Sequence, residues 1–297
     1  MPVSGVPDRG TVLDPTPFER LDLSGRRLVV VGGTNGLGRA VARQALARGA
    51  EVTVVGRTPR DAPSARLTFV EADLSSMREA VRLGQELPVE SADVVLFTLG
   101  IFAAKVREET DERVERDMAV SYLSRFAVLQ GLASRLGTAR PDPAPRPRVF
   151  VMGAPGTGAA GDPDDLNADR HYNGMRAHLN TVVANEALVL ARRDKPFGPA
   201  YFGLNPGVIK TDIRANYLGE GGITHRLLET VIGLVAQSPQ RYARRIVPLL
   251  FDPDLDGHGG ALFNSKARPI LPSRKLDEER VGRFMSASDE LLRRALS

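Results

Sequence analysis

A glycine-rich turn between an apolar segment and a helix-forming segment most constrains what this chain can fold into. The apolar residues 28–31 are followed by Gly32, Gly36 and Gly38, and apolar side chains at helical spacing follow the turn. Glycines let a backbone approach a pyrophosphate closely, and a helix N-terminus offers free N–H groups and a partial positive charge. The pattern therefore predicts a dinucleotide-binding strand–turn–helix unit, with a tight turn that binds no ligand as the alternative.

Segments of strand and helix character alternate along the rest of the chain. The alternation predicts an α/β fold with a doubly wound parallel sheet, of the Rossmann type. We expect its strands at residues 28–31, 51–55, 67–71, 94–99, 148–152, 200–204 and 260–263. An irregular arm over residues 1–24 would precede a single domain over 25–297, whose last helix, from Asp277, we expect at the surface. Ligands of such sheets bind outside the carboxyl ends of the strands.

The residue after the second predicted strand bears on the choice of dinucleotide. NAD-binding domains usually place an acid there to accept from the ribose 2′-OH, whereas an arginine can hold a 2′-phosphate. Arg57 occupies this position, and Arg39 and Arg60 are nearby in the sequence. We therefore expect NADP(H), the alternative being that Arg57 is an ordinary loop arginine.

The acid after the third predicted strand has two possible roles. Asp73 can cap the next helix, with Ser75 as a competing cap, and it can also accept a hydrogen bond from an adenine amino group. The two roles are compatible.

Composition excludes several classes of partner. The formal net charge is only +4, without a block of Lys and Arg, which argues against nucleic acid. No apolar run approaches the roughly 20 residues of a membrane span. With no leader-like segment and no Cys, we expect a soluble, cytoplasmic protein without disulfides. The four His lack metal-ligand spacing, so we expect no metal site. The oligomeric state stays open.

These motifs together resemble the short-chain dehydrogenase/reductase family, and within it the retinol-dehydrogenase-like branch, over about residues 24–265. Beyond the glycine turn, the resemblance rests on D-L-N at 165–167, Y-N at 172–173, A-N at 184–185 and P-G-x-x-x-T at 206–211. It implies cofactor contacts from Gly32, Thr34, Asn35, Gly36, Leu37, Gly38, Arg57, Asp73, Leu74, Leu99, Gly100, Pro206, Gly207, Val208, Ile209 and Thr211.

The catalytic positions depart from this family. Its members use Asn, Ser, Tyr and Lys together, and the matching positions here are Ser121, Ala154, His178 and Val182. Ala154 has no hydroxyl to polarise a carbonyl, and Val182 offers a methyl surface instead of a cation. His178 could act as a general acid, because an imidazole titrates near 6.5 without a neighbouring ammonium. Equally, His178 could fill space or bind a substrate oxygen.

Tyr172 is a possible replacement for the catalytic tyrosine of the family. Tyr172 and Arg176 have a Y-x-x-x-K-like spacing. The retinol-dehydrogenase-like branch, however, carries a Tyr-Asn pair ahead of its catalytic Tyr, and Tyr172 with Asn173 fills that place. We therefore favour His178 over Tyr172.

The sequence favours an NADPH-dependent ketoreductase for a bulky aromatic polyketide-type ketone or quinone. The proton would come from His178, Thr98, Ser121, water or an acidic hydroxyl of the substrate. The resemblance extends to antibiotic-pathway reductases, including angucyclinone-type ketoreductases. A Gly-rich segment and an amphipathic helix at about 212–238 predict a substrate lid, although the helix could equally be core. The alternatives are a redox-neutral cyclase, lyase or isomerase, and a non-catalytic NADPH sensor or partner-binding module.

Overall fold

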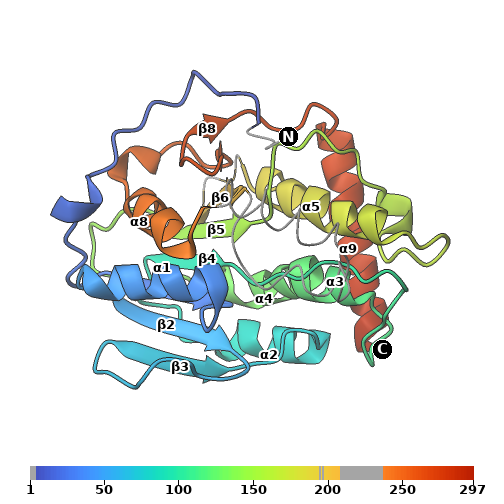
Figure 1. Cartoon of the computed structure of the whole chain (residues 1–297), viewed down its shortest axis with the longest axis horizontal. Helices are drawn as coiled ribbons and strands as arrows, with labels where there is room; N and C mark the ends of the chain where they lie inside the picture. The colour runs from blue at the N-terminus through green and yellow to red at the C-terminus, as the bar shows by residue number, and fades with distance from the viewer. Residues whose placement is uncertain (1–4, 194, 196, 208–236) are drawn as a thin grey trace, which may run out of the picture.

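The computed structural model describes residues 5–193, 195, 197–207 and 237–297, which build one α/β domain around an eight-stranded sheet (Figure 1). The strand order is β3-β2-β1-β4-β5-β6-β7-β8. The strands are β1 (Arg27–Val31), β2 (Glu51–Gly56), β3 (Leu67–Glu71), β4 (Val94–Phe97), β5 (Arg148–Met152), β6 (Ala200–Leu204), β7 (Leu262–Phe263) and β8 (Pro269–Ile270). Chain order reverses between β1 and β4, so the carboxyl ends of these neighbours face the crevice expected for a ligand. The doubly wound fold is confirmed.

Helices cover both faces of the sheet (Figure 1). One layer holds α1 (Gly36–Ala47) and α8 (Pro239–Leu250), and the other holds α2 (Met77–Glu86), α4 (Ser124–Leu132), α5 (Gly174–Leu190) and α9 (Glu278–Leu296). The central strands are buried on both sides, which explains why β1 and β4 are nearly continuous runs of Val, Leu and Phe.

The far edge of the sheet differs from the expected all-parallel arrangement. The strand predicted at 260–263 is reduced to β7, and β8 pairs with it antiparallel. The amino-terminal arm then extends this edge, because Leu271 N donates to Val6 O at 2.8 Å and Asp8 N donates to Pro269 O at 3.1 Å. Further along the arm, the Phe18 ring lies beneath the guanidinium groups of Arg48, which follows α1, and Arg244 on α8, at 5.0 and 4.6 Å.

The predicted cap of α2 needs correction. Ser76, not Asp73 or Ser75, caps α2, since its hydroxyl accepts from Glu79 N at 3.3 Å. The Asp73 carboxylate instead accepts from the amide and hydroxyl of Ser75, at 3.0 and 2.8 Å. The carboxylate of Glu112 also binds the first turn of α2, because it accepts a hydrogen bond from Met77 N at 2.7 Å.

The helix between β4 and β5 is interrupted by a π-helical turn. It begins as α3 (Arg116–Met118), continues as the π-helical turn η2 (Ala119–Leu123) and ends as α4. The extra residue of a π-helical turn shifts the direction of the side chains that follow, and such turns frequently mark functional sites. Here the turn contains Ser121, one of the candidate site residues.

The last helix is less superficial than expected. Helix α9 packs against α5 and α2 and buries one apolar face, which includes Phe284 and Leu291 (Figure 1). A buried hydrogen bond of 2.6 Å joins Tyr122 Oη on η2 to Ser288 Oγ on α9. The helix is therefore part of the core that supports the site.

Candidate active site

The glycine turn packs directly against the end of β4. Gly32 has a φ of +89°, and a Cβ there would lie 2.6 Å from the Leu99 amide nitrogen. A Cβ on Gly38 would lie 2.3 Å from both Gly32 O and Thr98 Oγ1. These two glycines are therefore required by close packing as well as by any ligand. The glycine turn and the end of β4 are therefore in direct contact.

The start of α1 is suited to a pyrophosphate. Asn35 is the N-cap residue but makes no side-chain capping bond, so its side chain leaves the first-turn N–H groups of α1 uncovered. Thr34 lies against the end of β2, where a Cβ on Gly56 would be 2.5 Å from Thr34 Oγ1. Gly36 opens the helix with a φ of +52°, and Leu37 is buried beneath it.

The residue that follows β2 is placed beside this turn. Arg57 is exposed and makes no ion pair within the described residues. Arg39 differs, because Asp61 holds it by two hydrogen bonds of 2.9 Å. Arg57 and Arg60, which is also exposed and makes no ion pair within the described residues, are thus the cations near the turn whose charges are available to a ligand.

The remaining predicted cofactor contacts line neighbouring strand ends. Asp73 is exposed and Leu74 buried after β3, while Leu99 and Gly100 are half-buried after β4. After β6, Pro206 is half-buried, and the Gly207 amide donates to Asn205 Oδ1 at 2.9 Å. Val208, Ile209, Thr211 and nearly all of the predicted lid at 212–238 lie outside the described residues. The described part fits a nicotinamide dinucleotide, which would supply hydride chemistry when bound.

A buried carboxylate orients the candidate histidine. His178 on α5 places Nδ1 2.8 Å from Asp117 Oδ2 on α3. The Asp117 side chain is fully buried, whereas that of His178 is 21% exposed. The other Asp117 oxygen accepts from Ser121 Oγ, which also accepts from Ile101 N at 2.9 Å. His178 Nε2 makes no hydrogen bond within the described chain and is the ring atom available to a substrate.

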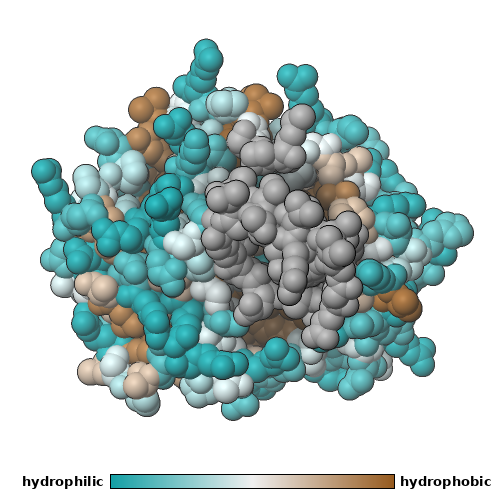
Figure 2. Space-filling model, in the orientation of Figure 1, coloured by the Kyte–Doolittle hydropathy of each residue, from teal (hydrophilic) through white to brown (hydrophobic). Residues whose placement is uncertain are grey.

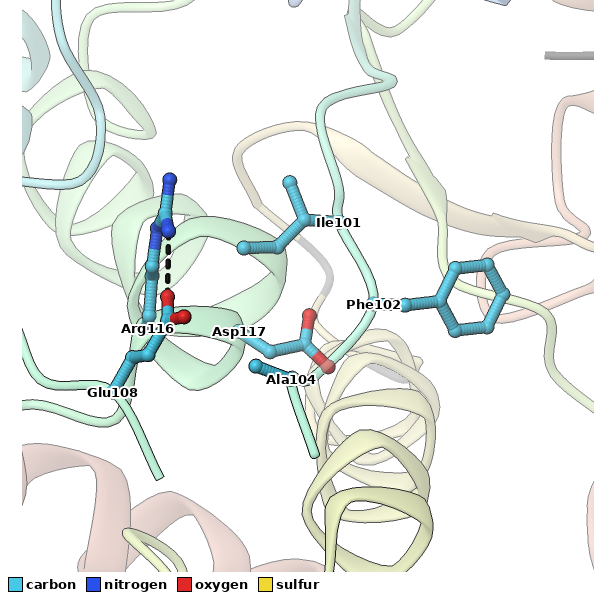
Figure 3. A pocket seen from close by; sticks show the side chains of 6 residues that line it. All are labelled: Ile101, Phe102, Ala104, Glu108, Arg116 and Asp117. Atoms are coloured by element: carbon cyan, nitrogen blue, oxygen red, sulfur yellow. Dashed lines mark hydrogen bonds and ion pairs between the residues drawn. The ribbon is translucent and has the colours of Figure 1, made fainter. Parts of the chain in front are cut away.

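A small pocket of about 110 Å³ lies beside this pair (Figure 3). Asp117 occupies its centre, between Phe102 on one side and the Glu108–Arg116 ion pair of 2.6 Å on the other. The Phe102 ring contacts the His178 ring, with centroids 4.3 Å apart. Asp117 and His178 therefore lie between the apolar Phe102 ring and the polar side of the pocket.

A second buried carboxyl lies two residues before Asp117. Burial and the charge of Asp117 together raise the pKa of Glu115 to about 7, although the hydrogen bond from the Met118 amide lowers it. Glu115 Oε2 accepts from Met118 N at 2.7 Å and so caps α3. Glu115 thus titrates near neutral pH inside the buried site.

Comparison with known proteins agrees with this arrangement. The profile of the short chain dehydrogenase family matches residues 26–140. An oxidoreductase of Saccharomyces cerevisiae described as uncharacterised is 43% identical over 95% of this chain and 95% of its own. The chain belongs to the short-chain dehydrogenase family. It is an oxidoreductase of this type, and the family uses NAD(H) or NADP(H) as cofactor.

More distant members of the family add detail. Mouse retinol dehydrogenase 14 is 24% identical over 91% of this chain and 86% of its own. A Streptomyces protein described as a candidate daunorubicin C-13 ketoreductase is 31% identical over 55% of this chain and 58% of its own. The crystal structure of an uncharacterised Mycobacterium paratuberculosis protein shares the fold, with a TM-score of 0.68 at 19% identity, covering 94% of this chain and 98% of that one.

The hydroxyls of two other candidate residues make structural contacts. The Thr98 hydroxyl faces the carbonyls of Val31 and Gly32, at 3.2 and 3.1 Å, and so holds the glycine turn. Tyr172 Oη donates to Ala104 O at 2.7 Å, and burial raises the Tyr172 pKa to about 12. Both hydroxyls are therefore held by backbone carbonyls and not by His178.

The structure also defines Val182 and Ala154, the two positions that the resemblance matched to the family's Lys and Ser. Val182 lies one turn after His178 on α5 and is buried. Ala154 follows β5 with a φ of +52°, a conformation that strains a residue with a Cβ. The backbone at this point is therefore bent sharply without a hydroxyl to aim at a substrate.

Sequence reasoning missed Asp117, Arg125 and Asn185 as site residues. Asp117 and Ser121 are four apart at the start of an otherwise apolar helix, and that spacing puts two polar side chains on one face. This signal could have identified the pair. In the described part of the chain, no helix is long and apolar enough to cross a membrane, and no group of His, Cys, Asp and Glu side chains is placed to hold a metal ion. Hydrophilic side chains dominate the described surface in Figure 2.

Proposed function

We propose that the protein is an NADPH-dependent ketoreductase in which His178 is the proton donor. The observation that carries this proposal is the 2.8 Å bond between His178 Nδ1 and Asp117, which leaves Nε2 as the free ring atom. A buried carboxylate on one ring nitrogen fixes the tautomer and orientation of a histidine acting through the other. The histidine thus has the arrangement of a general acid without help from a tyrosine or lysine.

Reduction of a ketone fits what these residues can do. The bound cofactor would supply a hydride to the carbonyl carbon. His178 Nε2–H would then donate its proton to the carbonyl oxygen, and the imidazole would return to its neutral form beside Asp117. Reprotonation from solvent restores the acid, so one ketone, one NADPH and one proton yield an alcohol and NADP⁺.

The cofactor preference rests on Arg57. It follows β2 beside the glycine turn, and its charge is not neutralised by any described acid. An arginine at this position can hold a ribose 2′-phosphate, which NADPH has and NADH lacks. The residue that follows β2 is thus an arginine and not the acid that would accept a hydrogen bond from the ribose 2′-OH of NADH.

For the substrate, we propose a bulky aromatic ketone or quinone of polyketide type. The Phe102 ring contacts the His178 ring at a tilt and offers an aromatic surface next to the proton donor. The relative described as a candidate daunorubicin ketoreductase gives this substrate class independent support. A hydroxyl beside the carbonyl of such a ketone could hydrogen-bond to the developing alkoxide, which compensates for the absent hydroxyl at Ala154.

The test is NADPH oxidation with a panel of polycyclic hydroxy-quinones and ketones, followed by identification of the alcohol. We expect loss of NADPH absorbance that depends on both ketone and protein, with transfer of deuterium from labelled NADPH to the product. Tight NADPH binding without reduction of any panel member would contradict the proposal. It would favour a redox-neutral reaction or a sensor instead.

A further inference from the structure

Arg125 is a buried cation beneath the active site. It is 2% exposed and lies on α4, directly after the π-helical turn. Its guanidinium donates to Met152 O at 2.9 Å, to Asn185 Oδ1 at 2.7 Å and to Leu99 O. It therefore connects the ends of β4 and β5, which meet at the catalytic crevice, to helix α5.

These acceptors are two carbonyls and an amide, so none of them neutralises the arginine. Burial lowers the pKa of Arg125 to about 9, and the charge that opposes this effect comes from Asp117. At neutral pH the guanidinium is still charged. A buried ion without a compensating charge is costly, so Arg125 and Asp117 stabilise one another although they do not touch.

A chain of hydrogen bonds also joins the two ions. Asn185 Nδ2 donates to Ser121 O at 2.9 Å, and Ser121 Oγ donates to Asp117, which holds His178. A Cβ on Gly153 would lie 2.4 Å from that of Asn185, so the amide is fixed against the β5 end. Arg125 thus helps to fix the orientation of His178 through the hydrogen bonds of Asn185 and Ser121.

The charge of Arg125 matters most after the proton has left. A protonated His178 neutralises Asp117, but a neutral His178 leaves a fully buried carboxylate beside an uncharged ring. Other titratable or charged side chains also lie around the pair. Glu115 caps α3 and Arg116 begins it, Glu108 lines the pocket, and Arg107 and Tyr172 come from the segments before α3 and α5. Arg116 is paired with Glu108 and Arg107 with Glu109 and Asp169, so neither cation is reserved for Asp117.

We propose that Arg125 is a positioning residue for the reduction: its buried charge balances Asp117 once His178 has donated its proton, and its hydrogen bonds fix the frame that holds the histidine. This inference rests on the proposed function for its catalytic part. Its electrostatic part can be tested without any substrate.

The first test is a double-mutant cycle on unfolding in denaturant. At a pH where His178 is neutral, Arg125→Met and Asp117→Asn each leave one buried ion uncompensated, whereas the double variant leaves none. We expect the double variant to be at least about tenfold more stable, in its unfolding equilibrium constant, than the sum of the single effects. Arg148→Met serves as the matched control, because this buried arginine pairs with Asp256 and should be additive with Asp117→Asn. Additive effects for Arg125 would overturn the proposal.

The second test uses the rate of ketone reduction as a function of pH. In Arg125→Met, Asp117 retains the histidine proton more tightly, so we expect kcat at neutral pH to fall at least about tenfold and the alkaline limb to move to higher pH. Arg125→Lys keeps the charge and should restore the position of that limb, although not the full rate. An unchanged limb in Arg125→Met would contradict the charge role. If the wild type reduces no ketone, the unfolding cycle still decides the electrostatic claim, and only the proposed function fails.

Discussion

Asp117 Oδ2 lies 2.8 Å from His178 Nδ1, across 61 residues of sequence, and the carboxylate is fully buried while the ring is partly exposed. The two side chains come from α3 and α5, which the π-helical turn and Asn185 hold together. This relationship gives the chain an oriented histidine beside the carboxyl ends of the strands. The first prediction concerns the carboxylate itself.

Asp117→Asn should lower kcat for ketone reduction by about 10²–10⁴-fold. The amide can keep the geometry, but it cannot stabilise a charged imidazole or enforce the Nδ1–H tautomer. NADPH binding should stay within about twofold of wild type, as measured by fluorescence titration. Asp111→Asn, in the loop before α3, is a suitable control. A variant with wild-type kcat would show that Asp117 serves folding alone.

Arg57→Ala should weaken NADPH binding by about 10–100-fold and NADH binding hardly at all, because only NADPH carries the 2′-phosphate. Calorimetric or fluorescence titration with both cofactors measures the difference. Arg78→Ala, an exposed arginine on α2, provides the matched loss of charge. Equal weakening of both cofactors would remove the basis for NADP(H) preference.

Glu115 predicts a pH dependence of stability. Its pKa of about 7 in the folded protein lies above the ordinary value of 4.5. Between these values the unfolded chain gives up the proton while the folded protein keeps it, so stability falls as pH rises and levels off above about 7. Glu115→Gln should remove a loss on the order of 2–3 kcal/mol over this window.

Denaturant unfolding of the wild type and Glu115→Gln between pH 4.5 and 8 measures this effect. The amide oxygen of Gln can still accept from Met118 N, so the cap is retained. Glu108→Gln is the control, since this acid is exposed and paired with Arg116. Parallel curves for wild type and Glu115→Gln would contradict the assignment.

Ser288→Ala should destabilise the protein by about 1–3 kcal/mol, because it leaves the buried Tyr122 hydroxyl without a partner. Tyr122→Phe combined with Ser288→Ala should recover most of this loss, since both polar groups are then absent. Unfolding midpoints in urea test the pair. If the double variant is no better than Ser288→Ala, the hydrogen bond does not anchor α9.

The sheet could be predicted from sequence because its strands are local apolar runs of four to six residues, as in β1 and β2. The two-residue strands β7 and β8 are too short to carry such a signal, and the β8 pairing depends on where the arm lies. The cap of α2 was misassigned because Asp73, Ser75 and Ser76 are all capping residue types. Geometry, not residue type, selects among them.

The site divides in a similar way. The glycine turn, Arg57 and His178 were identifiable because a motif or a substitution within a motif marks each of them. The contacts of Asp117 and Arg125 join segments 60 or more residues apart, so no local pattern pairs them with His178 and Asn185. Thr98 was a reasonable candidate by residue type, but its two bonds to the glycine turn become visible only in the fold.

The most direct test of the account is single-turnover NADPH oxidation by wild type, His178→Phe and His258→Phe, with one ketone that has a neighbouring hydroxyl and one that lacks it. Phe keeps an aromatic ring against Phe102 but removes the proton. We predict that His178→Phe loses at least about 10²-fold in rate with both ketones, while His258→Phe matches the wild type. Wild-type rates in His178→Phe with the hydroxy-ketone would contradict the account and assign protonation to the substrate.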